Sequence, residues 1–158
     1  MHMTRYLVPT LLLASLAASP SFGQTKAQIA KTAQDFQLQS LALSSNLAGL
    51  TKRVATASPN DKEMLKLVNG QLAIVDALAG NVMVLGALAG EMKDASDLSV
   101  AKKHLASSCR SLKASADSTG GYIGSVAASI ALPATIAEVG KAKDLLLQLG
   151  QHPLCNLK

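Results

Sequence analysis

Apolar side chains recur at alternating steps of three and four residues through almost all of the chain beyond residue 25. Such steps keep apolar side chains on one face of an α-helix, whereas a half-buried β-strand needs a step of two. Leu and Ala supply most of the apolar bulk, and both residue types favour helix. The spacing therefore predicts an all-α fold in which each helix buries one face.

Four segments carry this repeat, at about residues 25–57, 60–92, 97–131 and 133–150. The predicted core positions are Ile29, Ala33, Phe36, Ser40, Leu43, Leu47, Leu50, Val54 and Ala57; Leu65, Val68, Leu72, Val75, Ala79, Val82, Gly86 and Ala89; Leu98, Leu105, Cys109, Leu112, Ala116, Thr119, Ile123, Val126 and Ile130; and Ile136, Val139, Ala142, Leu146 and Leu149. Short connections between successive helices favour antiparallel neighbours. We expect an up-down-up-down four-helix bundle in one domain.

Local signals define where these helices begin and end. Pro59 pushes the residue before it out of the helical region and so ends the first helix. Asn60, followed three residues later by Glu63, predicts a capping pair at the start of the second helix. Residues 119–121 (Thr-Gly-Gly) predict a break or a kink in the third helix. Pro133 suits the first turn of the fourth helix.

The first 23 residues have the pattern of a cleavable secretory signal. Arg5 precedes an apolar stretch at residues 7–18, and small residues, Ser21 and Gly23, stand where a signal peptidase would need them. The apolar stretch is too short for a permanent membrane anchor, which takes about 20 residues. We expect cleavage after Gly23 and a mature domain of residues 24–158 in the periplasm or outside the cell; the competing interpretation is a buried N-terminal helix.

The two cysteines are predicted to form a disulfide. Cys109 and Cys155 lie equally far in sequence before and after residue 132, the expected corner between the third and fourth helices. In an antiparallel hairpin, positions equally far from the corner return to the same level. An exported chain meets an oxidising compartment, which favours the bond. We expect it to fix the C-terminal tail to the third helix.

The sequence predicts neither a metal site nor an enzyme, and it calls for no cofactor. His152 and Cys155 have a spacing that could chelate, but His104 and Cys109 point about 140° apart on a helix and would not converge on the same ion. The chain has no Gly-x-Ser-x-Gly, His-Glu-x-x-His or phosphate-loop motif.

The apolar content exceeds what one core needs, and we expect function to lie in that excess. Residues 72–90 contain a single charged side chain and residues 120–137 contain none. Exposed apolar helix faces usually mark protein contacts. We predict an interaction face for a partner protein or a second copy, made by Val82, Met83, Leu85, Ala87, Ile123, Val126 and Ile130.

Two alternatives use the same apolar segments. One is a carrier that holds an apolar or lipid ligand between the helices, in a cavity lined by Val82, Met83, Leu85, Ile123, Val126 and Ile130. The other is a hairpin that inserts into a membrane, which Asp76, Asn81 and Pro133 disfavour, as does the lack of an aromatic belt. Nucleic acid is not an expected partner, because the net charge of +5 is scattered and aromatic side chains are scarce.

Overall fold

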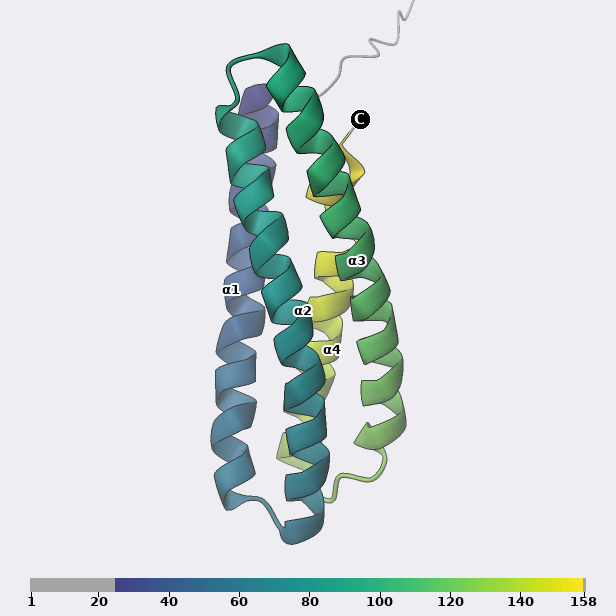
Figure 1. The fold of residues 1–158 in the computed structure, drawn as a ribbon. Helices are drawn as coiled ribbons and strands as arrows, with labels where there is room; N and C mark the ends of the chain where they lie inside the picture. The colour runs from purple at the N-terminus through teal and green to yellow at the C-terminus, as the bar shows by residue number, and fades with distance from the viewer. Residues whose placement is uncertain (1–24, 158) are drawn as a thin grey trace, which may run out of the picture.

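The computed structural model describes residues 25–157 and folds them into an antiparallel bundle (Figure 1). Its helices are α1 (Lys26–Thr56), α2 (Pro59–Glu91), α3 (Ala95–Ala127) and α4 (Pro133–Gly150), followed by the short 3₁₀ helix η1 (Pro153–Asn156). The described residues contain no strand, so the all-α prediction is confirmed. The predicted signal at residues 1–23, and Gln24 after it, lie outside the described part of the chain.

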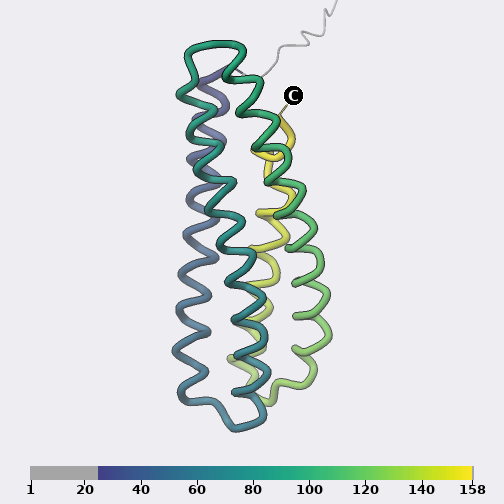
Figure 2. Tube along the Cα trace, viewed as in Figure 1, coloured from purple at the N-terminus to yellow at the C-terminus, as the bar shows by residue number. Residues whose placement is uncertain are grey.

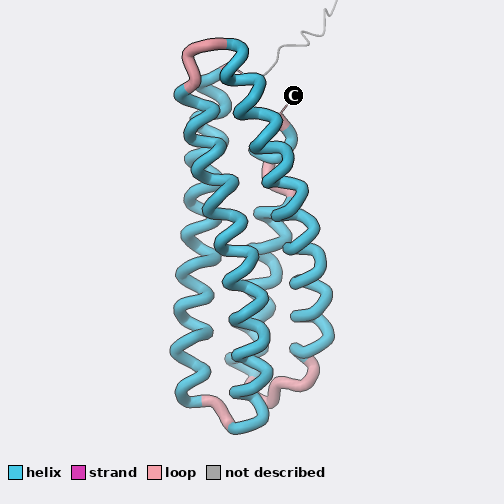
Figure 3. Tube along the Cα trace, in the orientation of Figure 1, coloured by secondary structure: helices cyan, strands magenta, loops and turns pink. Residues whose placement is uncertain are grey.

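Each long helix packs against its two neighbours around the bundle. α1 lies against α2 and α4, and α3 lies against α2 and α4, while the diagonal pairs have few contacts. The start of α1 and the C-terminal segment lie at the same end of the bundle, beside the connection between α2 and α3 (Figure 2). The connections are short and sit at the two ends of the molecule (Figure 3). This arrangement is the predicted up-down-up-down topology.

The beginning of α2 differs from the predicted capping pair. Ser58 is the N-cap, because its hydroxyl accepts a hydrogen bond from the backbone N–H of Asp61, and Pro59 is the first helical residue. A proline fits there because its missing N–H would have no partner in the first turn. The pairing of Asn60 with Glu63 was therefore wrong. At the start of α1, Thr25 and Gln28 form a reciprocal capping box.

Helix α3 starts and ends earlier than expected and continues unbroken through residues 119–121. Gly120 is buried against α4, where an added Cβ would lie 3.4 Å from Leu147 and 3.5 Å from Leu146. At these distances an added methyl group would make ordinary van der Waals contact with α4. Ile130 lies beyond the end of α3, yet it is 4 % exposed and still contributes to the core.

The buried residues follow the predicted core positions closely. Fully buried side chains on all four helices include Phe36, Leu43, Leu65, Leu72, Leu105, Leu112, Leu146 and Leu149. Ile136 is an exception, since it is 38 % exposed and its neighbour Thr135 is buried instead. Thr135 continues the step of three and four residues back from Val139, so the core side of α4 begins at Thr135 and not at Ile136.

The C-terminal tail completes the core where α4 ends. α4 is much shorter than the other helices, and η1 packs between α1 and α3 in the space beyond it. Leu154 is fully buried there. A Cβ built on Gly86 would lie 2.8 Å from the Leu154 Cδ2 atom and 3.3 Å from the Cβ of Ala33. The Leu154 side chain thus fills the space that a larger residue at position 86 would occupy.

Buried polar side chains tie the helices together at defined levels. Asp61, at the start of α2, accepts a hydrogen bond of 3.1 Å from the backbone N–H of Ala131 in the corner between α3 and α4. Midway along the bundle, the Ser44 hydroxyl of α1 donates to the Asp76 carboxylate of α2 over 2.6 Å. These bonds fix which residues of neighbouring helices lie side by side.

Candidate interaction face on helix α2

The seven residues of the predicted interaction face do not form a face. Val82, Ile123 and Ile130 are core residues with exposures of 0 %, 1 % and 4 %. Met83, Leu85 and Val126 are half-buried against the core, and Ala87 alone among the seven is exposed. The prediction was wrong because it assigned residues to a surface from their apolar character without separating the core side of each helix from its outer side.

The two groups of that face also lie at different levels of the bundle. The hydrogen bond between Asp61 and Ala131 places the corner after α3 beside the beginning of α2. Val126 is therefore level with the first turns of α2, and Val82 lies about 20–25 Å further along, at about 1.5 Å per residue. A single cavity lined by both groups, as the carrier alternative required, is incompatible with this geometry.

A different apolar surface is exposed on the outer side of α2. It lies opposite the core positions and comprises Gly70, Ala73, Ala77, Val84 and Leu88, all of them exposed; the polar Asn81, also exposed, lies between Ala77 and Val84. We call the five apolar residues the α2 strip. Val84 is 53 % exposed and Leu88 is 46 % exposed. Leu67 and Ile74 border the strip on the same helix, with exposures of 56 % and 52 %.

The α2 strip is uncharged along its length and has charges at its ends. Between residues 67 and 90 the helix contains a single charged residue, Asp76, and that carboxylate is bonded to Ser44 of α1. Lys66 precedes the strip and Glu91 follows it; both are exposed. Lys66 also lies 2.7 Å from Glu63 one turn earlier. The strip can therefore be covered without removing any charge from water along its centre.

Helix α2 is also the one helix within residues 25–157 with the length and apolar composition to cross a membrane. One third of its most apolar window, 33 %, is buried in the bundle. The rest of that window is partly buried or exposed, and Leu78, Met83 and Leu85 within it pack against the core.

A shallow groove of about 280 Å³ runs beside the C-terminal half of the strip. It lies between α1 and α2 and is lined by Ala30, Ala33, Gln34, Gln37, Met83, Ala87, Leu88 and Glu91. Leu41 follows Gln37 by one turn of α1 and is 55 % exposed. The groove and Leu41 extend the apolar surface of the strip toward α1.

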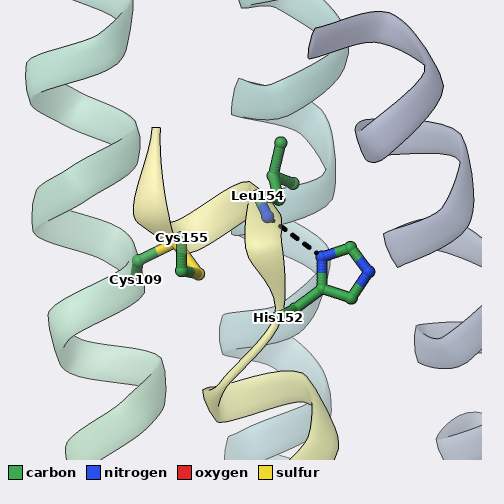
Figure 4. Close-up of a disulfide and its surroundings, with 4 residues drawn as sticks. All are labelled: Cys109, His152, Leu154 and Cys155. Carbon is green, nitrogen blue, oxygen red and sulfur yellow. Dashed lines mark hydrogen bonds between the residues drawn. A yellow bond between two sulfur atoms is a disulfide. The ribbon is translucent and has the colours of Figure 1, made fainter. Parts of the chain in front are cut away.

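Cys109 and Cys155 form the predicted disulfide, with their Cα atoms 5.3 Å apart (Figure 4). Cys109 lies on α3 and Cys155 in η1, so the bond fixes the tail against α3 at the level where Leu154 enters the core. The disulfide predicted from the equal distances of the two cysteines from the corner is therefore confirmed.

His152, whose spacing from Cys155 could suit a metal ion, has a structural role instead. Its Nδ1 atom accepts a hydrogen bond of 3.2 Å from the backbone N–H of Leu154 (Figure 4). Its ring packs edge-on against Phe36 with centroids 5.1 Å apart. Burial lowers the pKa of His152, and the nearby Asp35 partly opposes the shift. Within residues 25–157 no group of three His, Cys, Asp or Glu side chains is placed to hold a metal ion.

The remaining shifted pKa values come from ion pairs. The guanidinium of Arg53 on α1 donates to the carboxylate of Glu138 on α4, which lowers the pKa of Glu138 and raises that of Arg53. The hydrogen bond from Lys66 lowers the pKa of Glu63. Both pairs are partly or largely exposed to solvent, so they join helix surfaces and add little to stability.

The fold defines a class, an antiparallel four-helix bundle whose C-terminal tail is joined to the third helix by a disulfide. Comparison of the chain with family models, curated proteins and solved structures gives no match.

Proposed function

We propose that this protein is exported and acts without catalysis, by binding another protein surface through the α2 strip. The observation that carries the proposal is the exposed apolar side of α2, which joins Val84 and Leu88 with small residues over several turns. Soluble proteins rarely leave a long apolar surface in water unless it is an interaction site.

The export half of the proposal rests on two features. The signal-like pattern of residues 1–23 supports passage across a membrane. The disulfide between Cys109 and Cys155 is suited to an oxidising compartment such as the periplasm or the outside of a cell.

A protein surface fits the α2 strip better than a membrane does. Lipid headgroups attract basic residues and aromatic belts at the edges of an inserted surface. The strip instead ends in Lys66 on one side and Glu91 on the other, and its part of α2 has no Trp or Tyr. Opposite charges at the two ends of an apolar strip are typical of a protein interface with a defined orientation.

A comparison of two Leu→Lys variants tests the proposal. Leu88 lies in the strip and is 46 % exposed, whereas Leu132 lies at the opposite end of the bundle and is 47 % exposed. The tagged protein and both variants are used to capture partners from an extract of the cell envelope. We expect Leu88→Lys to lose the specific partner and Leu132→Lys to keep it. Equal capture by the two variants would contradict the assignment of the strip.

A further inference from the structure

We propose that the surface that covers the α2 strip is the α2 strip of a second copy of this chain, packed antiparallel in a twofold-symmetric dimer. This inference rests on the proposed function and names its partner. It comes from the way in which charge and side-chain size change along the strip.

Side-chain size is distributed unevenly along the strip. Its N-terminal half has Gly70, Ala73 and Ala77 along the middle, with the large side chains of Leu67 and Ile74 on one border only, and its C-terminal half has Val84 and Leu88 along the middle. All five strip residues are exposed, so no residue within 25–157 fills the space over the small ones. A helix surface that is hollow at one end and raised at the other fits its own copy only when the copy runs in the opposite direction.

An antiparallel register places the large residues over the small ones. When α2 of the second copy crosses near residues 78 and 79, Val84 of one copy lies opposite Ala73 of the other. In the same register Leu88 lies over Gly70, where the missing side chain leaves room for it. Each of these contacts occurs twice, because a twofold axis repeats it.

The charges at the ends of the strip agree with the same register. Lys66 of one copy lies opposite Glu91 of the other, again twice in the dimer. A parallel pair would instead set Lys66 beside Lys66 and Glu91 beside Glu91, and would leave Gly70 facing Gly70 across a gap. Charge and size therefore select the same orientation independently.

The extent of the strip sets the expected strength of the dimer. The distance from Lys66 to Glu91 along α2 is about 38 Å at about 1.5 Å per residue. With a helix about 10–12 Å wide, two such strips together cover on the order of 800–900 Å², before Leu67, Ile74 and Leu41 are added. Specific interfaces begin at about 1,000 Å², so we expect association in the micromolar range.

Sedimentation of charge-reversal variants tests the dimer and its register. The protein is expressed from its full sequence, purified without reductant, and its N-terminus is determined by mass spectrometry. We expect the wild type to form dimers at micromolar concentration. Lys66→Glu and Glu91→Lys should each weaken the dimer about tenfold, because each turns two exposed attractive pairs into repulsive ones. The double variant, Lys66→Glu with Glu91→Lys, should restore it.

The other outcomes are informative as well. Leu88→Lys should give monomers, and Leu132→Lys should remain dimeric; circular dichroism confirms that each variant is folded. A wild type that stays monomeric up to high micromolar concentration overturns the self-pairing. So does a dimer that ignores the charge reversals, because it must use another surface. If the monomeric protein still captures a different protein, or binds phospholipid vesicles, through Leu88, the strip is an interaction site with another occupant.

Discussion

Shortening Leu154 to Ala should destabilise the bundle even though the residue lies only four positions from the end of the chain. Leu154 is fully buried, and its methyl groups lie against the position of Gly86 on α2. The disulfide at Cys155 holds the tail in place, so the tail cannot shift far to close the space. Truncation of a buried Leu leaves a cavity and costs about 2–5 kcal/mol. We expect a loss of about 3 kcal/mol in the free energy of unfolding, near the middle of that range.

The contact between Leu154 and Gly86 makes this prediction more specific. A Cβ at position 86 would meet the Leu154 Cδ2 atom at 2.8 Å, so Gly86→Ala alone should overpack the core. Overpacking costs about 1–3 kcal/mol, from which about 1 kcal/mol of improved helix propensity is subtracted. In the Leu154→Ala background the clash with the Leu154 methyl groups disappears, and the new methyl group keeps only its 3.3 Å approach to the Ala33 Cβ. The helix-propensity gain is the same in both backgrounds, so the two changes should couple favourably by the overpacking cost, about 1–3 kcal/mol.

Urea unfolding of the wild type, the two single variants and the double variant, all oxidised and followed by circular dichroism, measures this coupling. Gly80→Ala is the matched control, because it lies on the same helix and a Cβ there meets nothing within 4 Å. Its effect should be the same in the wild-type and the Leu154→Ala backgrounds. If Gly86→Ala and Leu154→Ala add to within about 0.5 kcal/mol, Leu154 does not occupy the space over Gly86 and the packing argument fails.

Three further predictions concern the polar and covalent ties of the bundle. Replacing Cys109 and Cys155 by Ala should lower the unfolding free energy by about 4 kcal/mol, from the entropy of a 46-residue loop, in urea titrations; a loss below about 1 kcal/mol would contradict it. Asp61→Ala should cost about 1–3 kcal/mol, because the Ala131 N–H loses its acceptor, whereas Asp61→Asn should cost less. The His152 pKa lies below its ordinary value of 6.5, so the unfolded chain binds a proton more readily. Stability should therefore fall as the pH drops below about 6.5, and this part of the fall should be absent from His152→Gln.

The spacing of apolar residues was enough to predict the core because it fixes which side of each helix is buried. Ile29, Leu72 and Leu146 could each be assigned to the core from their own helix alone. The disulfide needed one more step, the counting of residues from a corner, and Pro133 placed that corner closely enough. Both inferences use distances along the chain, which the sequence contains directly.

To predict the interaction face, one must know which residues of different helices lie at the same height along the bundle. Apolar character alone does not give that information. Val82 and Ile123 were grouped because both stand in apolar segments, but they belong to the core at different levels. The outward positions of α2 carried a usable signal, since Val84 and Leu88 repeat at a helical step opposite the core positions. Nothing in the sequence indicated that Asp61 would bind the backbone of Ala131, a residue 70 positions away.

The covalent loop between Cys109 and Cys155 determines how the molecule would respond to mechanical force. Pulled by its two ends, the chain carries the load through α1, α2 and the first part of α3, then directly across the sulfur atoms to the tail. The 46 residue steps between the cysteines bear no tension, which keeps about 160 Å of extended chain from being released. Pulling would therefore extend α1, α2 and the first part of α3, while the disulfide keeps the loop that contains the rest of α3 and α4 closed.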